Sequence, residues 1–211
     1  MEALGFQLKG QHAFFKKREV NAYYYSTYGN IHKVVLLGIF GAILGYRGYE
    51  SPYGDFPEFY EKLRCLQVSV VPKGPRGGFA KKIQAFNNSV GYASQEQGGN
   101  LVVKEEWLER PEWTVYVLLE EEEGRKLAEA VLQNRCVYMP YLGKNDHPAD
   151  LGSARISPAV EIESKESYID SLFPASAVVL DEEDGFNFKY EEDLPIGLEK
   201  ETNQYRTAKM N

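Results

Sequence analysis

A glycine-rich apolar segment, residues 29–49, constrains the fold more than any other part of the sequence. It reads GNIHKVVLLGIFGAILGYRGY, and its pattern predicts a helix over residues 31–46. Three glycines interrupt that helix, at positions 38, 41 and 45, although each costs about 0.8–1.0 kcal/mol relative to alanine in a helix interior. A helix that retains them is expected to have a face that another element approaches closely.

The two ends of this helix carry the first candidate contacts. Asn30 is the expected N-cap, and His32 and Lys33 occupy the first turn, where the helix dipole favours acids over bases. A bound phosphate would relieve that repulsion; a first turn that faces solvent is the alternative. At the other end, Tyr46 and Arg47 could clamp a base, or pack under a sheet and cap the helix.

Charge is distributed unevenly along the chain. The net charge of −7 divides into +6 over residues 1–85 and −13 over residues 86–211. Between residues 62 and 95 there are six basic residues and no acid, namely Lys62, Arg64, Lys73, Arg76, Lys81 and Lys82. A basic face on an acidic body is typical of a protein that binds RNA on one side and protein partners on the other. The alternative is a solvated charged surface.

The order of predicted elements indicates an α+β fold. Strands are expected over residues 3–9, 65–71, 113–119, 155–162 and 177–180, a loop over 49–60 and a second helix over about 120–134. The resulting β-α-β, insertion, β-α-β order matches the ferredoxin-like plan of RNA-recognition modules. We therefore predict one such domain over residues 1–180, with an acidic and peripheral tail over 181–211.

The insertion, at about residues 72–104, is predicted to form a projecting β-hairpin, or thumb. Its polar side chains are candidate RNA contacts, in which lysines bind the backbone and amides read base edges; they are Lys81, Lys82, Gln84, Asn87 and Asn88. Phe86 is either an apolar wedge or part of the hairpin core. Arg76 precedes the hairpin, and a basic loop cluster of Lys16, Lys17 and Arg18 completes the set; a solvated loop is the alternative for that cluster.

Catalytic and metal chemistry find little support in the sequence. His32 and Tyr46 are 14 helical residues apart, roughly 20 Å, so they cannot share one scissile phosphate with Lys33, and no catalytic residue is assigned. The pair Asp146-His147 resembles a catalytic dyad, but beside Pro148 it is expected to belong to a loop rather than to an active site. Cys65 and Cys136 lack ligand spacing, so no metal or cofactor is expected, and a reduced, cytoplasmic location is predicted. The chain opens without a leader-like pattern, and the apolar run over 34–46 is too short for a membrane span.

Three segments together resemble a known family. They are the first strand with the glycine helix at 29–49, the run KEEWLERPEWTVYV at 104–117, and MPYLGKNDHP at 139–148. In this order they resemble the "Cas-five" family, the handle-binding subunit of type I CRISPR surveillance complexes (Cascade), in a subtype I-B-like form. The resemblance implies a RAMP fold, an RNA-recognition domain with a β-hairpin thumb.

The resemblance also implies a function in antiviral defence. The expected role is non-catalytic: binding the 5′ handle of the crRNA and contacting the Cascade backbone subunit and large subunit, with target DNA met only through the complex and no membrane involved. One subtype of the family is itself a metal-independent endoribonuclease, which makes pre-crRNA processing the first alternative. Lys104 is followed by Glu105 where that subtype has a Lys-His pair. An unrelated ferredoxin-like interaction module is the second alternative.

Overall fold

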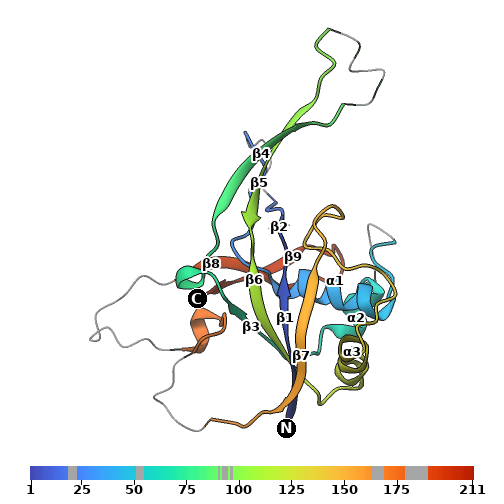
Figure 1. Cartoon of the computed structure of the whole chain (residues 1–211), viewed down its shortest axis with the longest axis vertical. Coiled ribbons are helices and arrows are strands. Elements are labelled where there is room, and N and C mark those ends of the chain that lie inside the picture. Colours follow the sequence, from blue (N-terminus) through green and yellow to red (C-terminus); the bar gives the residue numbers. More distant parts are fainter. Residues whose placement is uncertain are drawn as a thin grey trace, which may run out of the picture.

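A computed structural model describes residues 1–18, 23–50, 55–89, 91, 95, 97–162, 169–178 and 190–211. Its centre is a four-stranded sheet of β1 (Glu2–Lys9), β3 (Val68–Pro72), β6 (Glu112–Leu118) and β7 (Asp150–Pro158) (Figure 1). The strand order is β3-β6-β1-β7, and each neighbouring pair is antiparallel. This is the strand arrangement of the ferredoxin-like plan, so the predicted α+β fold is confirmed.

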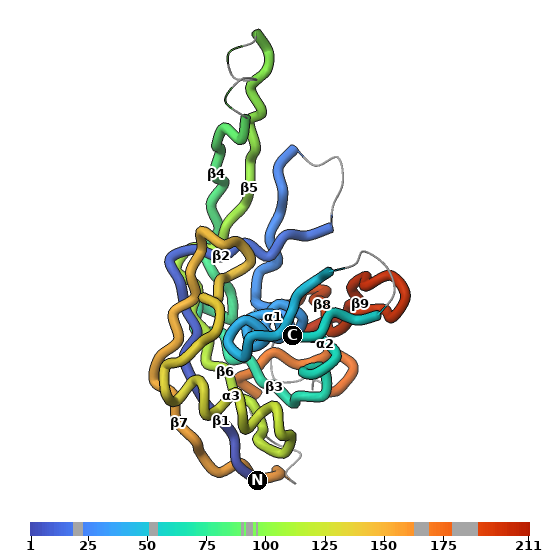
Figure 2. The backbone as a smooth tube through the Cα atoms, turned by 90° about the vertical axis from the view of Figure 1, so that its right-hand side faces the viewer, coloured from blue at the N-terminus to red at the C-terminus, as the bar shows by residue number. Residues whose placement is uncertain are grey.

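The helices lie together on one side of this sheet (Figure 2). They are α1 (Lys33–Leu44), α2 (Glu58–Leu63) and α3 (Glu122–Leu132), and α2 replaces part of the loop expected over residues 49–60. The register places Leu4 opposite Val117 and Phe6 opposite Val115, and all four side chains are buried. Alternation along each strand therefore directs these residues toward the helices. We call the sheet and its helices the palm.

The first turn of α1 differs from the prediction. The N-cap is His32, whose Nδ1 accepts the backbone N–H of Val35 at 3.4 Å, and Asn30 is not the cap. The Asn30 side chain is used elsewhere: its Oδ1 accepts from Trp113 Nε1 and its Nδ2 donates to the Gly77 carbonyl, both at 2.9 Å. A buried indole N–H requires a partner, and Asn30 supplies it.

The glycines of α1 have separate roles. A Cβ on Gly41 would lie 2.5 Å from the Phe59 Cβ, so Gly41 admits α2, which confirms the predicted close approach. Gly45 is the C-cap in the left-handed region, with φ of 81°, where glycine is favoured. A Cβ on Gly38 would come no closer than 4.0 Å to Phe59, and this glycine borders an open groove.

The predicted thumb is present as a long antiparallel hairpin of β4 (Lys81–Asn87) and β5 (Val102–Glu109) (Figure 1). The second arm extends five residues beyond the predicted Lys104, to Glu109. At the base of the hairpin, the short strand β2 (His12–Ala13) pairs with Glu109 and Leu108 of β5. The thumb is therefore joined to the palm by strand pairing as well as by the chain.

The end of the chain corrects the prediction of a peripheral tail. Residues 181–189 lie outside the described residues, but β8 (Glu192–Leu198) and β9 (Tyr205–Met210) form a hairpin against α1. Leu194 and Leu198 of β8 belong to the core, and the Leu198 N–H donates to the Tyr60 hydroxyl at 2.9 Å. Burying these leucines stabilises the hairpin in spite of its charge. In place of the strand expected at 177–180, a short 3₁₀ turn, η3, covers Ala175–Ala177, and residues 179–180 lie outside the described set.

Candidate nucleic-acid interface

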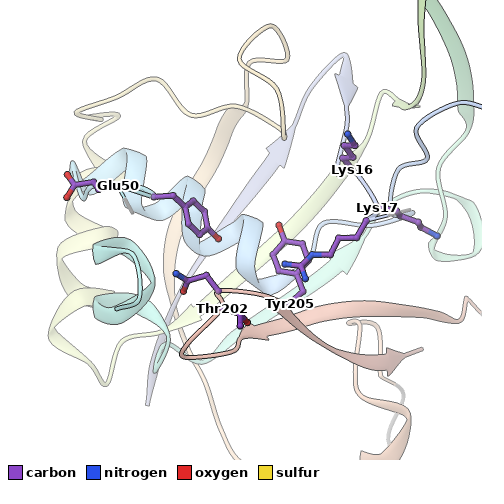
Figure 3. Close-up of a pocket in the computed structure, with 8 residues that line it drawn as sticks. Lys16, Lys17, Glu50, Thr202 and Tyr205 are labelled. Carbon is purple, nitrogen blue, oxygen red and sulfur yellow. The ribbon is translucent and has the colours of Figure 1, made fainter. Parts of the chain in front are cut away.

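Two adjoining cavities on the helical side of the palm form one groove. The first, of about 650 Å³, is lined by the basic loop and the β8–β9 hairpin (Figure 3). The second, of about 660 Å³, runs along α1. Tyr49, Glu50 and Tyr205 line both cavities. We call the first the basic end and the second the aromatic end of the groove.

The basic end contains all three residues of the predicted loop cluster. Lys16 Nζ lies 3.7 Å from the centre of the Tyr25 ring, and the Arg18 guanidinium lies 4.4 Å from the Tyr205 ring. Lys17 forms a salt bridge of 2.5 Å with Glu192. Within the described residues, no ion pair with a carboxylate is formed by Lys16 or Arg18. Aromatic faces position these two cations without neutralising their charge, so both can still bind a phosphate.

The aromatic end has a floor of small and apolar residues and walls of rings. Val35, Gly38, Ile39 and Ala42 of α1 form the floor. The walls include Tyr49 and Phe59, together with a segment that has three exposed side chains: Tyr138 (58% exposed), Met139 (77%) and Tyr141 (46%). The backbone N–H of Tyr138 donates to the Ala42 carbonyl at 3.0 Å, which fixes that wall to α1. Flat apolar surfaces of this kind suit unstacked bases.

Tyr46 and Arg47 line the aromatic end, as their candidate role requires, but both are engaged within the chain. The Tyr46 hydroxyl donates to Glu123, and burial together with that carboxylate raises the pKa of Tyr46 to about 12. Tyr46 therefore stays protonated near neutral pH. Arg47 pairs with Glu58 at 3.1 Å and with Glu50 at 3.2 Å, so a ligand would have to displace a carboxylate to reach it.

The first turn of α1 does not face a ligand. His32 is 3% exposed, and its ring lies 5.2 Å from that of Tyr28 and 5.3 Å from that of Tyr205. Burial lowers the pKa of His32 to about 3, so it is a neutral helix cap and cannot meet a phosphate as a cation. Lys33 Nζ donates to the Arg64 carbonyl at 3.1 Å, and burial lowers the pKa of Lys33. His32 therefore has a structural role, while Lys33 is bonded within the chain and its predicted phosphate contact stays a prediction.

The predicted thumb contacts lie on the hairpin rather than in the groove. Lys81 pairs with Glu106 at 3.2 Å and Lys82 with Glu109 at 3.7 Å. Phe86 lies 6.4 Å from Trp107, centre to centre, which places it in the hairpin core rather than as a free wedge.

The three amide residues of the thumb make hydrogen bonds within the hairpin, two through their side chains and one through its backbone. Gln84 Nε2 donates to the Ala85 carbonyl and Asn87 Nδ2 to Asn100 Oδ1, both at 3.4 Å, while the Asn88 N–H donates to the Leu101 carbonyl at 2.8 Å. Arg76 lies before the hairpin in the 3₁₀ turn η1 (Pro75–Gly77), with a left-handed φ of 55°. The thumb residues remain predicted contacts of a second, separate surface.

Several groove residues were not among the contacts predicted from the sequence. The sequence places Tyr49 in an expected loop and Tyr205 in the expected tail; Met139 and Tyr141 belong to the 139–148 motif, and Tyr138 lies just before it. A local signal existed in the exposed apolar run Val137–Met139, since contiguous apolar exposure marks interaction sites. Within the described residues, no group of three or more His, Cys, Asp or Glu side chains could bind a metal ion.

No protein-family model matches the sequence, and no curated protein does either. Among solved structures, a chain of a CRISPR RNA-guided surveillance complex aligns with a TM-score of 0.63 and 16% identity, over 98% of this chain and 88% of the other. The chain is similar in fold to that CRISPR protein. A second structure, of a Cas protein, aligns with a TM-score of 0.48 and 15% identity, over 75% of this chain and 67% of the other.

The similarity to the surveillance-complex chain covers nearly the whole sequence, including the β8–β9 hairpin. The mixed, mostly antiparallel α+β fold of this chain is thus similar to that of the surveillance-complex chain. No helix among the described residues is long and apolar enough to cross a bilayer.

Proposed function

We propose that the chain is a non-catalytic RNA-binding subunit of a CRISPR surveillance complex of the Cascade type, and that the groove binds the 5′ handle of the crRNA. The observation that carries the proposal is the joining of the two ends of the groove at Tyr49 and Tyr205. Single-stranded RNA offers phosphates and unstacked bases side by side. The basic end suits the first and the aromatic end the second.

The fold similarity supports this assignment, because the aligned chain belongs to an RNA-guided complex. The backbone subunit and the large subunit of Cascade are the proposed protein partners. The thumb, which does not line the groove, is available for them. A role in antiviral defence follows from membership of such a complex.

The test is a binding titration of labelled repeat RNA in EDTA. The same samples are run on a native gel for binding and on a denaturing gel for cleavage. We expect a shifted band with intact RNA. The double variant Lys16→Glu, Arg18→Glu should weaken binding at least tenfold, because it reverses two charges at the basic end. The matched control is Arg155→Glu, which changes an exposed cation on β7, and it should bind as the wild type does.

Each alternative has its own result. Cleaved RNA on the denaturing gel would replace the scaffold proposal with the endoribonuclease. Absence of binding in the wild type would favour an interaction module without RNA. Equal weakening by the Arg155 control and the groove variant would mean nonspecific electrostatic binding rather than a groove. Co-purification with the large and backbone subunits tests the partner assignment separately.

A further inference from the structure

A tryptophan and two histidines meet where the thumb joins the palm. The ring centre of Trp107, on β5, lies 4.5 Å from that of His147 and 5.5 Å from that of His12. The two histidine rings are 5.8 Å apart. His12 belongs to β2, and His147 belongs to residues 140–148, which we call the palm loop. The groove and its proposed ligand involve none of these three residues.

The palm loop is fixed to the palm. Leu142 is fully buried, its carbonyl accepts the Phe14 N–H at 3.0 Å, and its own N–H donates to the His147 carbonyl at 2.8 Å. Gly143 has a φ of 88°, and a Cβ there would lie 1.9 Å from the Phe14 carbonyl oxygen. His147 is therefore presented to the thumb from a rigid support.

The thumb is attached to the palm by two narrow connections. One passes through η1, where Arg76 and Gly77 have φ of 55° and 75°, and the other through Arg110, with φ of 46°. The orientation of the hairpin thus depends on contacts at its base. These contacts include the pairing of β2 with β5 and the backbone hydrogen bonds of Tyr25 with Lys104 and Glu106, both at 2.9 Å. The contacts with the palm loop are made by Trp107 and by Glu105, which forms a 2.9 Å salt bridge with Lys144.

His147 occupies a site that suits only a neutral ring. It is 4% exposed, and neither ring nitrogen has a hydrogen-bond partner among the described residues. A protonated ring would bring a charge and two N–H donors into this position, and buried donors without acceptors are costly.

The charged groups around the cluster are already engaged. Glu105 Oε2 accepts from Trp107 Nε1 at 2.8 Å and from Lys144, and Glu109 of β5 pairs with Lys82 of β4. Burial is the main cause that lowers the pKa of His147; His12 and Lys144 act in the same direction, while Asp146 and Glu105 oppose them. The pKa of His12 is also lowered, by burial and by Lys82, against Glu109.

We propose that this cluster is an acid-released latch, in which the neutral ring of His147 holds Trp107 and its protonation frees the thumb from the palm loop. A released histidine titrates near its ordinary pKa of about 6.5. Above that pH His147 is neutral in both the closed and the released state, so the pH does not weaken closure. As the pH falls below it, the released state gains the proton preferentially. Closure then weakens by up to about tenfold per pH unit, until the lower pKa of the closed state is reached.

Fluorine NMR of protein labelled with 5-fluorotryptophan tests the latch, because the chain has two tryptophans. Trp113 is fully buried, with its Nε1 bonded to Asn30, and serves as the internal reference. Trp107→Phe assigns the two signals. From pH 7.5 to pH 5.5 we expect the Trp107 signal to shift toward its solvent-exposed position while the Trp113 signal stays constant.

Two variants separate the histidines. His147→Gln should abolish the pH response of Trp107. His32→Asn alters a buried histidine whose ring neighbours are Tyr28 and Tyr205 and keeps a capping side chain, so it should preserve that response. An unmoved Trp107 signal in the wild type would overturn the proposal. So would a common shift of both tryptophans, which reports general unfolding, or an unchanged response in His147→Gln. Once Trp107→Phe has assigned the two signals, the wild-type titration decides without any histidine variant.

Discussion

Gly38 and Gly41 are three residues apart on α1 but have different surroundings. A methyl group on Gly41 would overlap Phe59, at 2.5 Å, whereas one on Gly38 would meet open space beyond a 4.0 Å contact. We expect Gly41→Ala to lower the free energy of unfolding by about 1–3 kcal/mol through overpacking. Gly38→Ala should raise it by about 0.8–1.0 kcal/mol through helix propensity. Urea denaturation of the pair measures both, and shifts of the same sign would contradict the assigned packing of α2.

His32 makes the stability of the fold depend on pH. Its pKa is about 3 when folded, against about 6.5 when unfolded. Below pH 6.5 the unfolded chain therefore binds the extra proton. The stability that the neutral cap contributes is complete above pH 6.5, and it is lost as the pH falls toward 3, by about 1.4 kcal/mol per pH unit.

The variant His32→Asn isolates this term, because asparagine retains a capping side chain and does not titrate. Chemical denaturation at pH 7.5 and at pH 5.5 gives the comparison. The wild type should lose about 1.4 kcal/mol more than the variant between the two values. Equal losses would show that His32 is not buried as a neutral cap.

At the level of elements, a buried hydrogen bond from the backbone of β8 to the Tyr60 side chain joins the β8–β9 hairpin to α2. Replacing Tyr60 by phenylalanine leaves the Leu198 N–H, now donating to the tyrosine hydroxyl at 2.9 Å, without its acceptor. An unsatisfied buried donor costs about 1–3 kcal/mol. Thermal unfolding should detect this loss, while the control Tyr141→Phe, at a half-exposed tyrosine, should leave the melting temperature unchanged.

That same hairpin marks the limit of what the sequence could predict. The palm strands and the thumb were predictable because their alternating apolar residues lie beside clear turns and helices. In β8, Leu194, Ile196 and Leu198 alternate as in a strand, but Pro195 and Gly197 stand between them, and both residue types argue against a strand. It is a strand because α1 offers an apolar surface that these leucines cover. Only the assembled core contains that information.

Only the basic end of the groove could be predicted from a local sequence pattern. Lys16, Lys17 and Arg18 are adjacent in sequence, so their cluster was visible before folding. Tyr49, Tyr138 and Tyr205 come from three separate segments and meet only across α1. Local patterns also misplaced the helix cap, because the buried indole that engages Asn30 is 83 residues away.

Across the whole molecule, the basic first part of the sequence and the acidic second part do not form two separate faces. Acidic side chains of the second half pair with basic side chains of the first: Glu106 with Lys81, Glu109 with Lys82 and Glu192 with Lys17. The basic surface expected along the thumb is thus largely compensated within the chain. Lys16 and Arg18, which rest on aromatic rings, are the better candidates for counterion release.

This difference gives a prediction about the salt dependence of RNA binding. Each phosphate contact to single-stranded RNA contributes a slope of about 0.7 in log Kd against log salt concentration. Replacing Lys16 and Arg18 together by glutamine should reduce the slope by about 1.4, since both contacts are lost. Replacing Lys81 and Lys82 by glutamine should reduce it by less, because each lysine first has to leave a carboxylate. Fluorescence anisotropy from low to moderate KCl measures both slopes. A larger reduction in the thumb variant would place the main phosphate contacts on β4 and leave the groove with a secondary role.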